Sequence, residues 1–221
     1  MTIPFLVWQL VDSAFPSGSF THSGGLEAAM QHGDVTGADD VERVARTAIG
    51  QAGRGLLPLV SAAHGQLADL PALDARADLF LNQPVSNRAS RAQGMSWLTT
   101  ARRVFSGDAI EAVADAVRRH GLCGHQAPIF GAVTRALNVD LDTACRLFLF
   151  HTARGPISAA VRLGVIGMFD GQRIQAAMGG PIEQTLNACR DLGPDDIAQA
   201  APILDLFQST QDRLYSRLFQ S

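Results

Sequence analysis

A segment rich in serine and glycine is the first place where this sequence could support covalent chemistry. Within it, Ser23 directly follows His22. A serine nucleophile on a sharp turn requires Gly-x-Ser-x-Gly after a strand, but Thr21 fills the first position and no strand-like pattern precedes it. We therefore interpret the segment as a turn that leads into a helix, and a hydrolase that uses His22 and Ser23 is the less favoured alternative. The residues expected to shape the turn are Pro16, Gly18, His22, Ser23 and Gly25.

One short stretch carries residue types that bind metals. His120, Cys123 and His125 lie within six residues of one another, and imidazole and thiolate groups bind zinc and nickel. No second ligand pair follows at the spacing of a structural zinc site, so we predict no resident metal ion and keep these three residues as candidates. The cysteines, at 123, 145 and 189, are too far apart to indicate a disulfide framework and favour a reducing compartment.

The basic residues exclude several catalytic mechanisms. All 18 of them are Arg and none is Lys, which excludes a P-loop, a Schiff-base lysine and a Ser-Lys dyad. The paired carboxylates at 39–40 and 195–196 follow glycines where helices are expected to begin, so capping explains them. We predict that the chain is not an enzyme.

Composition and charge restrict the class of protein further. Hydrophobic residues make up 47% of the chain and charged residues 18%, which is enough apolar side chain for a packed core. The net charge of −3 argues against a nucleic-acid partner. The runner-up interpretation, an all-α DNA-binding regulator, needs a basic N-terminal region, but the first 42 residues contain no Arg or Lys. No segment is typical of a membrane span, and residues 1–4 lack the basic residues of a signal peptide, so we expect a cytoplasmic protein.

Helical periodicity runs through the chain and predicts an all-α, single-domain bundle over residues 1–221. Apolar residues recur at helical spacing over 41–60 and 108–119. Residues 141–169 are apolar nearly all round, as in a central buried helix, and Gly155-Pro156 should break or kink that segment. The connections are short, and none resembles a flexible linker between domains.

The C-terminal end carries an apolar stripe that something must bury. On a continuous helix, Ile203, Phe207, Leu214 and Leu218 would lie within about 60° of one another, and Tyr215 would lie beside them. The segment either folds back on its own domain or docks into a groove on a partner. A second interaction surface is suggested by Arg88 and Arg91, which lie in a stretch without acidic residues; internal ion pairing is the alternative.

Five blocks, in order, make the chain resemble the urease accessory protein F (UreF) family. They are Gln9-Leu10-Val11-Asp12-Ser13 with Pro16-x-Gly18-x-Phe20-x-His22-Ser23-x-Gly25-Leu26-Glu27; Asn87-Arg88-Ala89-Ser90-Arg91-x-Gln93-Gly94; His125-Gln126-Ala127-Pro128-Ile129-Phe130-Gly131; Ile157-Ser158-Ala159-Ala160-Val161-Arg162-Leu163-Gly164 with Gly171-Gln172; and Leu214-Tyr215-Ser216-Arg217-Leu218-Phe219. The first block is called the N-terminal motif below. Each block is short, and their common order over most of the chain is what makes the resemblance specific.

The resemblance implies a dimeric, all-α chaperone rather than an enzyme. Such a protein binds urease accessory protein D (also called H), recruits the GTPase urease accessory protein G, and acts with them to insert nickel into apo-urease. Nickel and GTP are then handled by the complex, with no cofactor bound by this chain itself. The resemblance places Tyr215, Arg217, Leu218 and Phe219 at the contact with protein D, and Arg88 and Arg91 at the surface facing the GTPase or the dimer partner. One departure is Gln211, where the family often has His.

Overall fold

The computed structural model describes residues 5–221, and no strand occurs among them. The all-α prediction is confirmed, whereas the predicted absence of a signal peptide concerns residues 1–4, which lie outside the described residues. Over 5–221, no helix is both long and apolar enough to cross a membrane. The helices are α1 (Phe5–Val11), α2 (Leu26–Gln31), α3 (Ala38–Gly55), α4 (Leu57–Gly65), α5 (Leu70–Phe80), α6 (Pro84–Val104), α7 (Asp108–His120), α8 (Gln126–Ala136), α9 (Leu141–Arg162), α10 (Met168–Ala177), α11 (Gly179–Cys189) and α12 (Pro202–Thr210).

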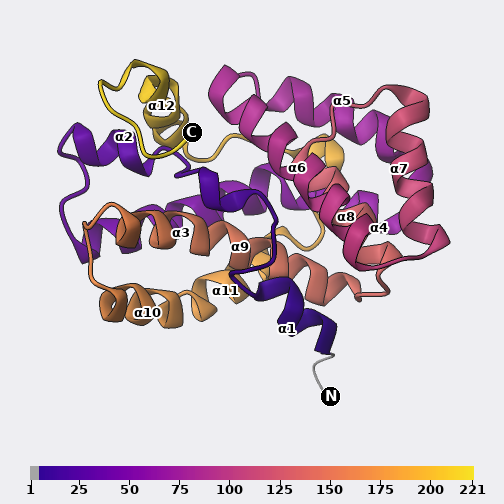
Figure 1. The fold of residues 1–221 in the computed structure, drawn as a ribbon, viewed down its shortest axis with the longest axis horizontal. Coiled ribbons are helices and arrows are strands. Elements are labelled where there is room, and N and C mark those ends of the chain that lie inside the picture. The colour runs from indigo at the N-terminus through magenta and orange to yellow at the C-terminus, as the bar shows by residue number, and fades with distance from the viewer. Residues whose placement is uncertain (1–4) are drawn as a thin grey trace.

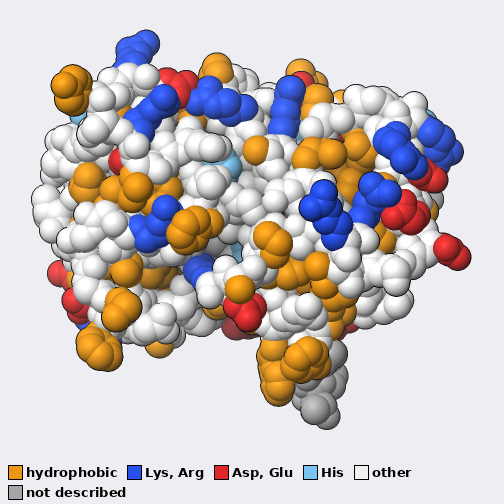
Figure 2. Space-filling model, in the orientation of Figure 1, with side chains coloured by type: hydrophobic (Ala, Val, Ile, Leu, Met, Phe, Trp, Pro, Cys, Tyr) orange, Lys and Arg blue, Asp and Glu red, His pale blue; other side chains and the backbone are white. Residues whose placement is uncertain are grey.

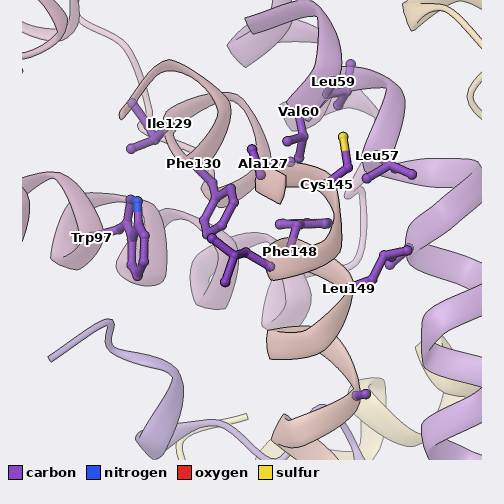
Figure 3. Packing of buried hydrophobic residues seen from close by; sticks show 14 of the residues in the cluster. Leu57, Leu59, Val60, Trp97, Ala127, Ile129, Phe130, Cys145, Phe148 and Leu149 are labelled. Atoms are coloured by element: carbon purple, nitrogen blue, oxygen red, sulfur yellow. The ribbon is translucent and has the colours of Figure 1, made fainter. Parts of the chain in front are cut away.

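Helix α8 is the most enclosed part of the core. All eight residues from 127 to 134 are buried, and the helix packs against α4, α5, α6, α7 and α9 (Figure 1). In Figure 3 the ring of Phe130 lies between Trp97 of α6 and Phe148 of α9. The ring centroid of Phe130 is 4.9 Å from that of Trp97 and 5.4 Å from that of Phe148. These aromatic contacts tie three helices together at one point.

Two glycines allow the helices around α8 to approach closely. A Cβ at Gly131 would overlap the carbonyl of Val60 in α4, and a Cβ at Gly94 in α6 would overlap the carbonyl of Gly124 just before α8. Gly94 and Gly131 belong to the second and third of the blocks described above. The backbone contact between α6 and the start of α8 therefore depends on a missing side chain.

Helix α9 does not break where the sequence suggested. It runs continuously from Leu141 to Arg162 with Pro156 inside it, so of the predicted break or kink at Gly155-Pro156 the break does not occur, and the chain leaves the helix only after Arg162. A proline removes one helical N–H, and here α9 is enclosed by α3, α4, α10 and α11, whose packing holds its course.

The predicted helix over 41–60 is two helices. Helix α3 ends at Gly55 and α4 begins at Leu57, with Leu56 between them at φ −117°. Pro58 lies in the first turn of α4, and in a continuous helix it would lack the N–H that bonds to the carbonyl four residues back, while its ring would clash with that carbonyl. The apolar periodicity is present on both sides of Leu56, but the proline separates it into two helices.

The C-terminal stripe is also divided. Helix α12 ends at Thr210, a 3-10 turn covers Gln211–Arg213, and Leu214 is extended at φ −64° and ψ 137°. Leu214 and Leu218 therefore do not continue the face formed by Ile203 and Phe207, which corrects the continuous-helix expectation. After α12 the chain turns back to α2 and to the segment before it, at the upper left of Figure 1.

The close approach at Gly94 can be tested by adding one methyl group. Gly94→Ala should lower the free energy of unfolding by about 1–3 kcal/mol, because the new Cβ meets backbone atoms that cannot move aside. Chemical denaturation monitored by circular dichroism measures this change in the free energy of unfolding. Gly50→Ala in α3 is the matched control, since open space surrounds its Cβ position and alanine favours a helix. Equal stability of the two variants would contradict this packing.

Candidate functional site

A buried carboxylate in α2 holds the last eleven residues of the chain, which we call the C-terminal segment (residues 211–221). Glu27 is 2% exposed. Its oxygens accept hydrogen bonds from the backbone N–H of Leu218 at 2.6 Å and of Phe219 at 3.1 Å, and from the side-chain amide of Gln211 at 2.7 Å. Hydrogen bonds to a charged acceptor are stronger than neutral ones. Glu27 therefore joins the two ends of the segment to the N-terminal motif.

His22 and Ser23 bind the same segment and do not form a nucleophilic pair. The Nδ1 atom of His22 lies 2.6 Å from Oγ of Ser221, and the Ser23 hydroxyl donates to the Ser221 carbonyl at 2.9 Å. The backbone N–H of Gln220 donates to the carbonyl of Thr21 at 2.8 Å. Ser23 is 1% exposed and its hydroxyl is used in these bonds, so the geometry favours the structural interpretation over the hydrolase.

Phe219 is packed into its own domain. Its ring is 3% exposed, and the guanidinium of Arg162 in α9 lies 4.3 Å from the ring centroid. The same guanidinium lies 3.6 Å from the ring of Phe20 and donates to the carbonyl of that residue. A cation between two rings is attracted to both. Arg162 thus connects α9, the N-terminal motif and the C-terminal segment.

A three-residue ion network covers the outside of the segment. Asp212 accepts from Arg88 of α6 at 2.5 Å and from Arg217 at 2.8 Å. The Arg88 guanidinium holds the pKa of the Asp212 carboxyl below its usual range. All three side chains are about half exposed, so each exposed ion pair contributes little to stability. Arg88 and Arg217 are therefore at the surface, but both are turned towards Asp212.

Several large side chains of the C-terminal segment and α12 are exposed, although Leu204 of α12 is buried. Tyr215 is fully exposed, and Leu218, Ile203 and Leu206 are 55%, 48% and 61% exposed. At the upper left of Figure 2, over α12 and the segment after it, hydrophobic and arginine side chains lie together at the surface. The segment therefore has an inward side that anchors it and an outward side that is free for a partner.

The N-terminal motif is itself pinned to α6 and α12. The carbonyl of Pro16 accepts from Ser96 at 3.0 Å and from Thr100 at 2.8 Å. Gly18 and Gly25 have φ angles of +80° and +90°, which a residue with a Cβ rarely adopts, and a Cβ at Gly25 would lie 3.1 Å from the backbone nitrogen of Gln208. These residues shape the surface that receives the C-terminal segment.

A second polar cluster lies where α5, α6 and α8 meet. His125 is fully buried; its Nδ1 lies 3.1 Å from Oγ of Ser90, and its Nε2 lies 3.1 Å from Oδ1 of Asp78. Arg91 pairs with the same Asp78 oxygen. Cys123 joins Asp78 and His125 in one group of potential metal ligands, whereas His120, on the exposed end of α7, is not part of that group.

Three acidic residues of these sites, Glu27, Asp74 and Asp78, were not among the candidates predicted from the sequence. Glu27 closes the N-terminal motif, and its position in the first turn after two glycines was the available signal. Asp74 is 2% exposed and accepts from the backbone N–H groups of Cys123, Gly124 and His125. Nothing in the sequence around Asp74 or Asp78 distinguishes them from solvated aspartates.

Removal of the Glu27 carboxylate should release the C-terminal segment. In Glu27→Ala, three donors lose their acceptor inside the protein, at about 1–3 kcal/mol each if they remain buried, so the segment should detach instead. Trypsin should then cleave after Arg213 and Arg217 at least about tenfold faster, measured by mass spectrometry. Glu42→Ala, which removes a half-buried carboxylate paired with Arg46 at the surface of α3, is the control. Unchanged cleavage in Glu27→Ala would show that Glu27 does not hold the segment.

Acid should loosen the same contact through His22. Burial, with Arg88 adding to it, lowers the pKa of His22 from 6.5 to about 4. Between these pH values the unfolded chain binds a proton that the folded chain does not. The contribution of neutral, buried His22 to the free energy of unfolding is therefore complete above pH 6.5 and is lost as the pH falls towards 4. From about pH 7 to about pH 5, thermal unfolding should reveal a loss of up to about 2 kcal/mol from this residue. His22→Gln should reduce the slope of the free energy of unfolding against pH.

Comparisons with known proteins find relatives that match nearly the whole chain in sequence. A family model described as UreF matches residues 35–179. Urease accessory protein F of Oryza sativa subsp. indica is 34% identical over 220 residues, covering 96% of this chain and 83% of the relative. Urease accessory protein F of Arabidopsis thaliana is 34% identical over 218 residues, covering 97% and 91%. Urease accessory protein UreF of Paenarthrobacter aurescens is 28% identical and covers 100% and 99%. The chain therefore belongs to the UreF family of urease accessory proteins.

Proposed function

We propose that this chain is an adaptor in urease maturation that joins urease accessory protein D (H) to the GTPase urease accessory protein G. The complex then inserts nickel into apo-urease. The observation that carries the proposal is the two-sided C-terminal segment, whose inward residues anchor it while Tyr215 and Leu218 are displayed. An exposed tyrosine beside exposed aliphatic side chains and arginine is typical of an interface hot spot.

The four C-terminal residues expected at the contact with protein D take different roles in this proposal. Tyr215 and Leu218 supply contact area because they are exposed. Arg217 orients Asp212 at the rim. Phe219 acts indirectly: its ring is buried against Arg162, so it positions the segment that protein D binds. Gln211 likewise acts from inside, through Glu27.

The arginines of α6 are assigned to separate tasks. Arg88 pairs with Asp212 and belongs to the edge of the protein D surface. Arg91 pairs with Asp78 and is directed towards the cluster around His125. We propose that the neighbouring surface of α6 faces the GTPase or a second copy of this chain, in a homodimer. In a chain without lysine, GTP is bound by the GTPase partner, the nickel is cargo of the complex, and the complex assembles in the cytoplasm.

Binding to protein D tests the proposal directly. Tyr215→Ala and Leu218→Ala should each weaken the affinity for purified protein D by about tenfold or more, because truncating a hot-spot side chain costs about 2 kcal/mol. Isothermal titration calorimetry measures the change. The matched control is Leu79→Ala, which removes from α5 a side chain of the same size as Leu218 that is 80% exposed. Thermal unfolding of each variant shows whether the fold is intact.

The outcomes distinguish the proposed adaptor role from the proposed contact between the C-terminal segment and protein D. If wild-type protein binds neither protein D nor protein G, the adaptor proposal is wrong. If it binds protein D and both variants bind equally well, the adaptor role stands and the C-terminal segment is not the contact. Urease activation in cells expressing the weak-binding variants should fall in parallel with the affinity.

A further inference from the structure

The loop between α7 and α8 brings together ligands from separate parts of the sequence. One ligand atom each from Asp78, Cys123 and His125 lies within 4.8 Å of the other two. Asp78 is near the end of α5, and the other two residues lie just before α8. Thiolate, imidazole and carboxylate are the three ligand types that zinc takes in proteins, and imidazole and thiolate also suit nickel. Cys123 and Asp78 are partly exposed while His125 is buried, so the group opens to solvent on one side.

The loop that carries two of these ligands is rigidly held. The carboxylate of Asp74 accepts from the backbone N–H of Cys123 at 2.7 Å, of Gly124 at 3.0 Å and of His125 at 2.8 Å. Gly124, at φ +78°, turns the chain between the two ligands. A ligand pair whose backbone is already ordered loses little entropy when it binds an ion.

The hydrogen bond between Nδ1 of His125 and the Ser90 hydroxyl is of the kind that holds a metal-binding histidine. Ser90 Oγ lies 3.1 Å from Nδ1 of His125 and also accepts from the backbone N–H of Gln126 at 3.1 Å. A hydroxyl can donate to Nδ1 or accept from Nδ1–H. The ring can therefore move its proton from Nε2 to Nδ1 without rotating, which frees the Nε2 lone pair for an ion. Metal-bound histidines are held in this way by a second hydrogen bond.

Asp78 can accept an ion on its second oxygen. Its bonds from Asn87, Arg91 and His125 all end on Oδ1, and among the described residues Oδ2 receives no protein hydrogen bond. Arg91 is the cation nearest to the group, and its side chain is 42% exposed. A divalent ion at Asp78 would therefore compete with Arg91, which can turn outward.

We propose that Asp78, Cys123 and His125 form a binding site for a divalent transition ion such as zinc or nickel, with Arg91 as the competing cation. On binding, the Cys123 thiol gives its proton to solvent and forms the metal–sulfur bond. His125 binds through Nε2, Asp78 binds through Oδ2, and water completes the coordination. No electron is transferred. His120, although close in sequence, takes no part.

Cobalt(II) added to the purified full-length chain is the probe, because a thiolate ligand produces a charge-transfer band in the near-ultraviolet. The wild-type chain should develop this band with one ion per chain. Cys123→Ser should abolish it, and Ser90→Ala should weaken binding by about 10–100-fold, as removal of an outer-shell partner does. Arg91→Gln should bind about tenfold more tightly, because the competing charge is gone.

His120→Ala is the matched control and should bind cobalt as the wild type does. Zinc should also slow alkylation of Cys123 in the unmutated chain, mapped by mass spectrometry, which requires no variant to fold. The proposal is overturned if the wild type forms no thiolate–cobalt band, if Cys123→Ser retains it, or if zinc leaves alkylation of Cys123 unchanged. An Arg91→Gln variant with unchanged affinity would overturn the role of Arg91.

Discussion

The buried carboxylate of Glu27 is the constraint on which the position of the C-terminal segment depends. A charge removed from water must be compensated by hydrogen bonds, and all the donors that Glu27 finds come from residues 211–219. The N-terminal motif is therefore incomplete without the other end of the chain. This dependence explains how an irregular segment with few backbone bonds of its own keeps a defined position against α2.

The buried carboxylate of Asp74 is compensated by hydrogen bonds in the same way, at the loop before α8. The Asp74 carboxylate orders this loop through three backbone N–H groups, and the loop presses against Gly94. The second and third family blocks are thus the two sides of one contact. Glu27 and Asp74 are both buried, and each accepts its hydrogen bonds from a segment distant in sequence. The two carboxylates thus hold the C-terminal segment and the loop before α8, which lie outside the apolar core around Phe130.

In this member of the UreF family, the polar side chains that could have suggested catalysis or anion binding hold segments of the fold together. The side chains of His22 and Ser23, which could have suggested catalysis, are hydrogen-bonded to Ser221. Arg162, Arg88 and Arg217 hold segments together through rings, carbonyls and Asp212. An arginine suits these tasks because its planar guanidinium both stacks on rings and forms directed hydrogen bonds.

The amino-acid sequence by itself determined the helical class and the family, because periodicity and ordered motifs are local. It could not determine that α9 passes through Pro156, that the last helix stops at Thr210, or that Phe219 points inward. Those outcomes depend on what packs against each element. It also grouped His120 with Cys123 and His125, whereas the folded chain substitutes Asp78 from α5. Only tertiary structure decides such partners, since a buried polar group takes its hydrogen bonds from whichever segment the core brings beside it.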